Sequence, residues 1–330
     1  MKRGKIAIPL FLLAICLSSV WLVNHSLHPH LPQAGDPPRL YSNQSRQDLR
    51  LTVLEALKCA KHSIYLSIFG LSDPAVIDAL QKKIEAKVET TVYYDPNGAA
   101  QIPAMRHSSF IPVRRGGLMH QKILVVDGDL ILIGSANLTS ASLSMHDNLI
   151  VGLRSPKAAQ FLIDHPPFTS GHLQTLSGGQ EVALWLLPDP RGHALTDLRR
   201  RIHNASKSIR AALFTLTHPS LVEDLITAKQ RGVAVFLVID AHSGLGASAK
   251  AVAQLRHEGV SVSLSQGLGL LHYKFALIDE QTLISGSANW TQSAFAKNSD
   301  CLLILNQLND TQRRFCSRLW QRIKRESRPI

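Results

Sequence analysis

The chain has 330 residues and a mass of 36.3 kDa, which is enough for one large domain or two of ordinary size. Hydrophobic residues make up 45% of it and charged residues 18%, and this excludes a chain that is disordered throughout. The formal net charge of +12 favours anionic partners such as lipid headgroups or nucleic acid, without choosing between them.

The N-terminus combines a basic start, residues 1–5, with 18 uncharged and mainly apolar residues, 6–23. This order is typical of a signal peptide or a signal anchor. The segment is long for a cleaved signal and lacks a clear cleavage site, so we favour an uncleaved anchor; cleavage and lipid modification at Cys16 are the alternatives. Positive residues precede the segment and only Arg39 follows closely, which predicts the folded part on the outer side of a membrane, as in a bacterial envelope.

A linker is expected at residues 24–40, because this segment holds four prolines and three histidines. The histidines have no visible scaffold that would fix them as metal ligands, and the four cysteines form no Cys-x-x-Cys pair. We therefore predict no metal site, no cofactor and no complete disulfide framework.

Beyond the linker the chain repeats itself, since residues 53–95 align without a gap on residues 198–240 at an offset of 145. Each half reads as helix, strand, helix and strand. The expected elements are helices at residues 47–60 and 195–205, strands at 63–69 and 208–216, helices that begin near Pro74 and Pro219, and strands at 89–94 and 233–239. This alternation predicts an α/β fold of two similar lobes, residues 41–165 and 181–310, that meet face to face.

Each half also carries a polar cassette, repeated at an offset of 152. The first copy contains His120, Lys122, Asp127, Gly134, Ser135 and Asn137, and the second contains His272, Lys274, Asp279, Gly286, Ser287 and Asn289. Only seven of the 18 positions from His to Asn are identical, and they are these six and one alanine. Packing alone would keep apolar character and let polar identities drift, so the cassette predicts a chemical role for both halves.

The spacing inside the cassette places it on strands and turns. His and Lys stand two residues apart, so on a strand they face the same side. Buried strands are expected at residues 123–126 and 275–278, returning strands at 130–133 and 282–284, and the Gly-Ser-x-Asn segments at the turns that follow.

The C-terminal segment, residues 311–330, holds six Arg and one Lys against one Glu. Phe315, Leu319 and Ile323 recur every four residues, which predicts an amphipathic helix packed on the second lobe. Its basic face is either solvated or in contact with anionic lipid.

The paired residues match what the cleavage of a phosphodiester requires: a nucleophile, an acid for the leaving oxygen, and positive charge around the phosphoryl oxygens. A histidine, with an ordinary pKa of roughly 6.5, serves as nucleophile or as proton donor according to its protonation state. Lys122 and Lys274 would neutralise the phosphoryl oxygens, and Asn137 and Asn289 would donate hydrogen bonds to them. The two lysines supply the charge that a divalent ion gives elsewhere.

These residues resemble the motif of the phospholipase D superfamily, H-x-K-x(4)-D followed by G-[ST]-x-N, over roughly residues 45–305. The resemblance implies one active site at the interface of two lobes and a two-step reaction through a phosphohistidine. It also implies that His120 is the nucleophile and His272 the general acid, with the reverse order as the alternative.

The resemblance further implies an acidic residue, eleven positions after the motif Asn, that orients a catalytic imidazole. In the second copy this residue is Asp300. The first copy departs from the pattern with Asn148 at that position and Asp147 just before it, and either of these is a candidate. Asp127 and Asp279 are expected to have structural roles, and Ser135 and Ser287 to support the turn or to contact phosphate.

The superfamily includes lipases, synthases and nucleases, so the substrate stays open. Because an anchor would hold the site beside phospholipid, we favour a hydrolase that removes headgroups and leaves phosphatidic acid. A nuclease is the alternative, supported by the pI near 9.8 and by Arg114 and Arg115. Phosphatidyl transfer of the cardiolipin synthase type is third. A catalytically silent binding protein that uses the same pocket is the hypothesis outside the class of enzymes. Two half-sites in one chain predict a monomer.

Overall fold

The computed structural model describes residues 29–45, 47–99 and 110–330. The predicted anchor at residues 1–23, with Cys16, and the first part of the predicted linker lie outside the described residues. Within the part that is described, no helix combines the length and the apolar character needed to cross a bilayer.

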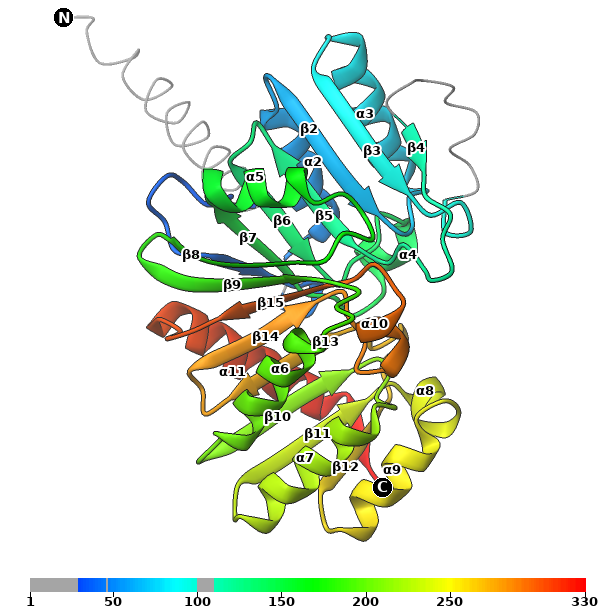
Figure 1. Ribbon diagram of the computed structural model, residues 1–330, viewed down its shortest axis with the longest axis vertical. Coiled ribbons are helices and arrows are strands. Elements are labelled where there is room, and N and C mark those ends of the chain that lie inside the picture. The colour runs from blue at the N-terminus through cyan, green and yellow to red at the C-terminus, as the bar shows by residue number, and fades with distance from the viewer. Residues whose placement is uncertain (1–28, 46, 100–109) are drawn as a thin grey trace, which may run out of the picture.

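Two mixed β-sheets, one for each lobe, form the centre of the molecule (Figure 1). The first has the strand order β1-β7-β6-β5-β2-β3-β4, and the second the order β16-β12-β11-β10-β13-β14-β15-β9-β8. The strands of the first sheet are β1 (Arg39–Tyr41), β2 (Ser63–Ile68), β3 (Glu89–Tyr94), β4 (Phe110–Pro112), β5 (Lys122–Val126), β6 (Leu130–Gly134) and β7 (Ile150–Arg154). Those of the second are β8 (Gly171–Ser177), β9 (Gln180–Leu186), β10 (Ser208–Leu213), β11 (Ala234–Ile239), β12 (Ser261–Ser265), β13 (Lys274–Ile278), β14 (Thr282–Gly286), β15 (Cys301–Leu305) and β16 (Ser327–Pro329).

The sequence repeat is a repeat of topology. Strands β10 to β15 occupy in the second sheet the places that β2 to β7 occupy in the first. In both sheets the first three strands of this set run parallel, and the remaining pairs are antiparallel. The predicted α/β fold of two similar lobes is confirmed.

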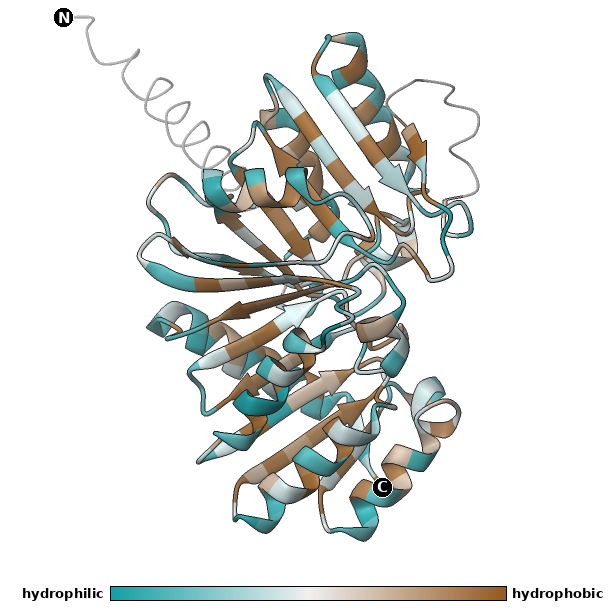
Figure 2. Cartoon of the chain, viewed as in Figure 1, coloured by the Kyte–Doolittle hydropathy of each residue, from teal (hydrophilic) through white to brown (hydrophobic). Residues whose placement is uncertain are grey.

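The two sheets pack face to face, and helices cover their outer faces. One buried cluster is shared by both sheets and holds Ile123 and Val151 of the first with Phe275 and Leu303 of the second. A separate cluster lies under the helices of each lobe. The first sheet is covered by α2 (Leu49–Cys59), α3 (Pro74–Glu85) and α4 (Ser140–Ser144). The second sheet is covered by α6 (His193–His203), α7 (Pro219–Gln230), α8 (Ala241–Leu245), α9 (Ala249–His257) and α10 (Gln292–Ala296). The shared core also receives side chains from α5 (Pro156–Asp164) and α11 (Asp310–Arg325). Figure 2 shows the strands as mainly hydrophobic and the outer sides of the helices as mainly hydrophilic.

Local signals in the sequence set the helix ends. Pro74 and Pro219 stand in the first turns of α3 and α7, as predicted, where a missing N–H costs no helical hydrogen bond. Asp73 caps α3 by accepting hydrogen bonds from the backbone N–H groups of residues 75 and 76. Asn309 and Gln312 form a capping box at the start of α11.

The second part of the predicted linker differs from the prediction, because residues 31–40 pack on the first lobe. Leu31 and Leu40 are buried, and Arg154 donates a hydrogen bond from Nε to the carbonyl of Pro32 at 2.7 Å. Strand β1 pairs with β7, with Arg39 opposite the middle of that strand. The apolar side chains and the ladder bonds account for the docking. The chain therefore enters the lobe at the end of β7 where that strand meets α5, and less of it is free to act as a spacer.

Two more boundaries differ from the predictions. The second sheet begins at Gly171 with β8, earlier than the lobe boundary expected at residue 181. The C-terminal helix ends at Arg325, after which β16 adds a strand to β12. Helix α11 also touches the first lobe, where Gln312 donates from Nε2 to the carbonyl of Pro38 at 2.6 Å. It therefore joins the lobes and does not lie on the second one alone.

Candidate active site

The two cassettes lie at the same edge of the sandwich, and each is held by the opposite lobe. Met119 forms an isolated bridge with Ser299, and Leu271 forms one with Asp147. As a result the N–H of His120 donates to the carbonyl of Ser299 at 2.8 Å, and that of His272 to the carbonyl of Asp147 at 3.0 Å. Both histidines lie just before strands β5 and β13, which begin at their lysines. One site is thus built by two lobes.

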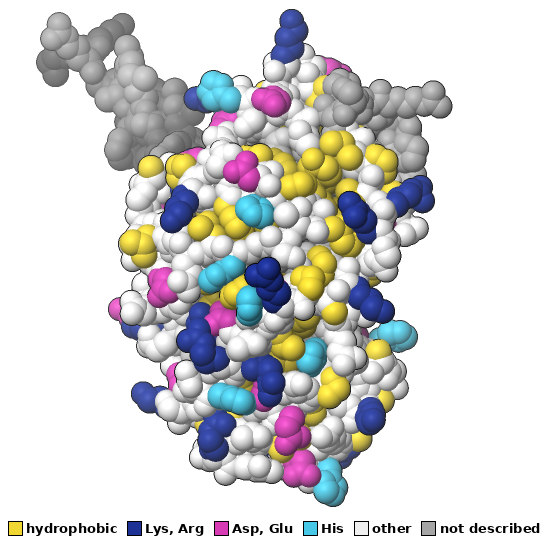
Figure 3. Space-filling view, viewed as in Figure 1, with side chains coloured by type: hydrophobic (Ala, Val, Ile, Leu, Met, Phe, Trp, Pro, Cys, Tyr) yellow, Lys and Arg dark blue, Asp and Glu magenta, His cyan; other side chains and the backbone are white. Residues whose placement is uncertain are grey.

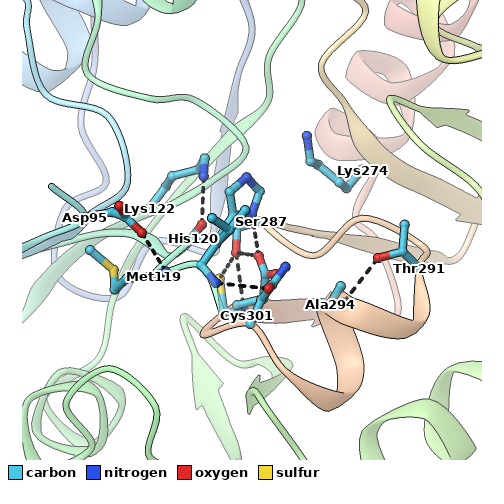
Figure 4. Close-up of polar contacts among 12 residues, drawn as sticks. Asp95, Met119, His120, Lys122, Lys274, Ser287, Thr291, Ala294 and Cys301 are labelled. Atoms are coloured by element: carbon cyan, nitrogen blue, oxygen red, sulfur yellow. Dashed lines mark hydrogen bonds and ion pairs between the residues drawn. The ribbon is translucent and has the colours of Figure 1, made fainter. Parts of the chain in front are cut away.

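Asp300 orients His120 across the interface. The Nδ1 atom of His120 lies 2.7 Å from Oδ1 of Asp300, whose residue has no exposed surface. Ser287 donates to the same carboxylate oxygen at 2.7 Å and accepts from the backbone N–H of Cys301 at 3.0 Å. The hydroxyl of Ser287 therefore holds the orienting carboxylate. Figure 4 shows His120, Ser287 and Cys301 in this arrangement.

Asn148 takes the equivalent place at His272. Its Oδ1 lies 3.0 Å from Nδ1 of His272 and accepts from the hydroxyl of Ser135 at 2.8 Å. Its Nδ2 donates to the carbonyl of Ser142 at 2.9 Å, so the amide oxygen is the atom that faces the imidazole. The two imidazoles consequently meet different groups, a carboxylate at His120 and a neutral amide at His272.

Asp147, the other candidate for this place, points elsewhere. Its carboxylate accepts from Nε2 of Gln44, and burial raises the pKa of Asp147 to about 6. Only its backbone carbonyl reaches His272. The structure thus separates two alternatives that the sequence left open.

Both imidazoles have the same tautomer when they are neutral. A carboxylate or an amide oxygen beside Nδ1 requires that Nδ1 carries the proton. The Nε2 atoms of His120 and His272 are then free to act as nucleophile or base, or as acid once protonated. Both residues are 8% exposed, which leaves the site open to a reactant but poorly solvated.

The lysines lie beside the imidazoles and are almost fully buried. The Nζ of Lys122 donates to the carbonyl of His120 at 2.7 Å, and that of Lys274 to the carbonyl of His272 at 2.9 Å. Figure 4 places the two lysines on either side of His120. Each ammonium also faces an aromatic ring that sequence reasoning missed. The Nζ atom of Lys122 lies 5.3 Å from the ring centroid of Phe69, and that of Lys274 lies 5.0 Å from the ring centroid of Phe214. Phe69 and Phe214 are related by the offset of 145, which is the signal by which the sequence could have identified them.

The buried cations shape the protonation of the site. Burial lowers the pKa of Lys122 to about 8 and holds the pKa of Lys274 well below its usual value. Burial and Lys122 also lower the pKa of His120, although Asp300 acts to raise it. The pKa of His272 lies well below its usual value, because it is buried beside Lys274 and Lys122 and has no carboxylate partner in the described part of the chain. A bound phosphodiester anion would offset this positive field and favour the protonated forms.

The carboxyl of Asp300 remains ionised in this environment. Burial alone would raise its pKa, but His120, Lys122 and the hydroxyl of Ser287 lower it further, so the pKa of Asp300 lies below its usual value. A permanent negative charge therefore stands behind His120.

Asp127 and Asp279 lie at turns away from the imidazoles. Asp127 accepts hydrogen bonds from the backbone N–H groups of residues 61–63, and Asp279 from those of residues 206–208. Each carboxylate fixes the start of β2 or β10 to the turn after the cassette strand. These contacts agree with the structural roles that were expected.

The Gly-Ser-x-Asn segments bring the orienting residues into place. A Cβ on Gly134 would lie 2.1 Å from the carbonyl oxygen of Leu149, and one on Gly286 would lie 2.3 Å from that of Cys301. Glycine thus permits the close approach of the strand that follows Asn148 or Asp300. The side-chain oxygens of Asn137 and Asn289 are buried without a hydrogen-bond partner among the described residues. An amide oxygen only accepts, so each oxygen can receive a hydrogen bond from a ligand, whereas contact with a phosphoryl oxygen would have to come from Nδ2.

Two further carboxylates support the histidine segments. Asp95 accepts from the N–H of Met119 at 3.0 Å, and Asp240 accepts from the N–H of Leu271 at 3.0 Å. Both are buried and matched in the sequence repeat, although the cassette motif did not include them. They fix the residue that precedes each catalytic candidate.

No group of three or more His, Cys, Asp or Glu side chains suited to a metal ion occurs within residues 29–45, 47–99 and 110–330. The positive charge of the described site comes from its lysines and, when protonated, its histidines.

Comparisons with known proteins agree on the motif and the fold. A family model described as cardiolipin synthase, PLD-like domain, matches residues 53–165 and 198–325. The mitochondrial cardiolipin hydrolase of Xenopus laevis is 32% identical over 131 residues, which are 39% of this chain and 61% of that protein. A phospholipase D of Rickettsia felis is 27% identical over 108 residues, which are 33% of this chain and 54% of that protein. The chain thus spans about half of the length of these curated relatives.

A solved structure resembles the chain over both lobes. The crystal structure of phosphatidylserine synthase from Haemophilus influenzae Rd KW20 superposes with a TM-score of 0.73 at 13% identity, covering 91% of this chain and 89% of that one. At this identity the likeness shows that the fold is shared.

Proposed function

The chain belongs to the phospholipase D superfamily, and on that premise we propose that it is a metal-independent phosphodiesterase that works through a phosphohistidine. The observation that carries the proposal is the pair of imidazoles at one interface, each oriented through Nδ1 by the opposite lobe. Two buried lysines supply the positive charge that a phosphate diester requires, and we propose that the Nδ2 groups of Asn137 and Asn289 donate hydrogen bonds to its oxygens.

In the first step Nε2 of His120 attacks phosphorus, and the bond from phosphorus to the leaving oxygen breaks. Lys122 and Lys274 stabilise the charge that gathers on the non-bridging oxygens. His272, protonated on Nε2, gives its proton to the leaving oxygen. In the second step His272 takes a proton from water, the water oxygen bonds to phosphorus, and His120 is released.

The unequal partners support this division of labour. An imidazole that becomes phosphorylated gains positive charge, and the ionised Asp300 behind His120 stabilises that charge. An imidazolium with only an amide behind it is the stronger acid, which suits His272 as the proton donor.

We favour phospholipid as the substrate, with release of the headgroup and formation of phosphatidic acid. Curated relatives named cardiolipin hydrolase and phospholipase D support a lipid diester. The basic and apolar N-terminal segment in the sequence supports a phospholipid membrane as partner, with the lobes on the extracytoplasmic side of a bacterial envelope. We also propose a monomer, because one chain supplies both half-sites.

Nuclease activity is the second candidate. It is favoured by the net charge of +12 and by the exposed Arg114 and Arg115 ahead of the first cassette. On the face seen in Figure 3, however, Lys and Arg are scattered among acidic side chains and form no continuous stripe of the kind that follows a nucleic-acid backbone. Phosphatidyl transfer is third, and it differs from hydrolysis only in the alcohol that replaces water in the second step.

The test is to assay the full chain in the presence of EDTA on phosphatidylcholine, cardiolipin and single-stranded DNA, beside His120→Ala and His272→Ala. We expect turnover of lipid that both substitutions abolish. Cleavage of DNA alone would contradict the lipid substrate, and no turnover of any diester would contradict the enzyme.

A further inference from the structure

Exposed aliphatic side chains lie in segments near the two cassettes. Among the described residues eight large hydrophobic side chains are exposed, and five of them lie in segments near the cassettes. The four most exposed of these five are Leu118, Met145, Leu245 and Leu268, with exposed fractions of 42%, 62%, 77% and 105%. We name these four residues the apolar rim. Burial of an aliphatic side chain stabilises a folded protein by roughly 1.5 to 3 kcal/mol, and this stabilisation is lost for each side chain that stays in water. Exposed aliphatic side chains that share one edge are therefore typical of an interaction surface.

Backbone contacts link two rim residues to the segments that hold the catalytic pair. The carbonyl of Leu118, two residues before His120, accepts from the N–H of Ser299 at 2.9 Å. Met145 ends α4, three residues before Asn148, and a Cβ on Gly269 would lie 2.1 Å from the carbonyl oxygen of Met145. Leu268 therefore lies in a loop that abuts Met145.

Leu245 belongs to the same edge. It ends α8, whose N-cap Asp240 accepts from the N–H of Leu271, the residue before His272. Figure 1 shows α4, α8 and α10 on one side of the molecule, across from the described start of the chain. The rim thus lies around the site on the edge remote from residues 29–38.

The charges near the rim are positive. The described segments that form this edge are residues 110–118, 139–147, 241–250, 266–271 and 291–298. They present Arg114, Arg115, Lys250 and Lys297 to solvent, and their one carboxylate, Asp147, is buried. Apolar side chains flanked by cations match an anionic bilayer surface, where the aliphatic groups enter the hydrocarbon and the cations meet headgroups.

The composition of the edge disfavours nucleic acid. Single strands are usually bound by stacking of bases on exposed aromatic rings. The aromatic residues of these described segments, Phe110 and Phe295, are buried, so the exposed contacts are aliphatic.

We propose that the apolar rim inserts into the surface of an anionic phospholipid bilayer and delivers lipid headgroups to the site. The inference rests on the proposed phosphodiesterase function and adds its partner surface. It assigns Leu245 and Leu268, which lie outside both cassettes, to interfacial binding and not to the reaction.

A comparison of two physical forms of one substrate tests the proposal. The full chain, its Leu245→Ser/Leu268→Ser variant and the control Leu176→Ser are assayed on long-chain phosphatidylcholine vesicles, with and without phosphatidylglycerol, and on monomeric short-chain phosphatidylcholine. Leu176 is a matched control because it is 63% exposed and lies in β8, away from the cassettes. We expect the rim variant to lose about tenfold or more on vesicles and to keep the wild-type rate on the monomer, since two fewer leucines partition into the bilayer. If the rim variant and the wild type have equal rates on vesicles, or if the variant loses the same activity on vesicles and on monomers, the proposed role of the apolar rim is wrong.

A second readout separates the rim from the reaction. An environment-sensitive NBD dye is attached to Leu268→Cys or to Leu176→Cys in a full chain whose Cys16 and Cys59 are serine. We expect a blue shift for the dye at residue 268, and none at residue 176, when anionic vesicles are added. A wild type that turns over no diester but gives this shift contradicts the proposed function and supports the rim; the absence of the shift contradicts the rim whatever the activity.

Discussion

Replacement of Asn148 by aspartate tests the asymmetry between the two imidazoles. The new carboxylate would stand at the Nδ1 atom of His272, where the amide oxygen now lies at 3.0 Å, as Asp300 does at His120. A unit charge about 4 Å away contributes roughly 4 kcal/mol at an effective dielectric constant of about 20, which corresponds to an upper bound of about three pKa units. Burial of the new carboxylate offsets part of this. We therefore expect the pKa of His272 to rise by about one to two units.

The direction of the expected shift in the pH profile follows from the role of His272 as proton donor. A proton donor with a higher pKa keeps its proton to higher pH, so the alkaline limb of the kcat profile, which reports the enzyme–substrate complex, should move upward by the same amount. The measurement is a pH profile on a diester with an alkoxide leaving group, which needs a proton. The same diester with p-nitrophenolate as leaving group should show a smaller change, because that anion departs unprotonated.

Stability must be followed alongside activity. Nδ2 of Asn148 donates to Ser142 at 2.9 Å, and aspartate cannot replace this bond, so we expect a loss of about 1–3 kcal/mol in the free energy of unfolding. Asn148→Ala loses the same donor without adding charge and is the matched control. A folded Asn148→Asp protein whose alkaline limb stays in place or moves to lower pH would refute the reasoning.

Three more predictions concern the other groups of the site. Lys122→Ala and Lys274→Ala should each lower kcat/KM by about 10²–10³-fold through lost charge stabilisation, whereas saturating EDTA should leave the wild-type rate unchanged; kinetics with and without chelator check both. Asp300→Asn should lower kcat by about 10³–10⁴-fold and move the acidic limb to lower pH, because the nucleophile loses the carboxylate that raises its pKa; a rise of that limb would contradict the assignment. Asp127→Ala and Asp279→Ala should each cost about 2 kcal/mol of stability in urea unfolding, with kcat close to wild type, since both carboxylates bind backbone N–H groups, and Asp279 also the hydroxyl of Ser206, away from the imidazoles.

The fold followed from the sequence because local signals and repetition agreed. Alternation of strands and helices, with Pro74 and Pro219 at matched helix starts, predicted the elements of both lobes. The offset of 145 also predicted that the lobes would share a topology, which the strand orders confirm. The sequence did not indicate that residues 31–40 dock on the first lobe. The prolines in this segment favour a linker, and the short strand β1 forms because it pairs with β7, which no local pattern predicts.

The site was predictable as a set of residues but not as a set of contacts. The sequence placed Asp300 after the second cassette, yet that carboxylate serves His120 of the first. Such an exchange depends on the packing of the two lobes, which no local pattern encodes. The same packing decides that Asn148, and not Asp147, faces His272, and that Ser135 and Ser287 hold the orienting groups.

The measurement that tests the central claim most directly is the trapping of the covalent intermediate. In His272→Ala, a diester with p-nitrophenolate as leaving group should still react with His120, because this group needs no proton, while hydrolysis of the adduct should stall without the base. Mass spectrometry is expected to find one alkylphosphoryl group on His120, and none in His120→Ala. Turnover without an adduct, or an adduct on another residue, would contradict the account.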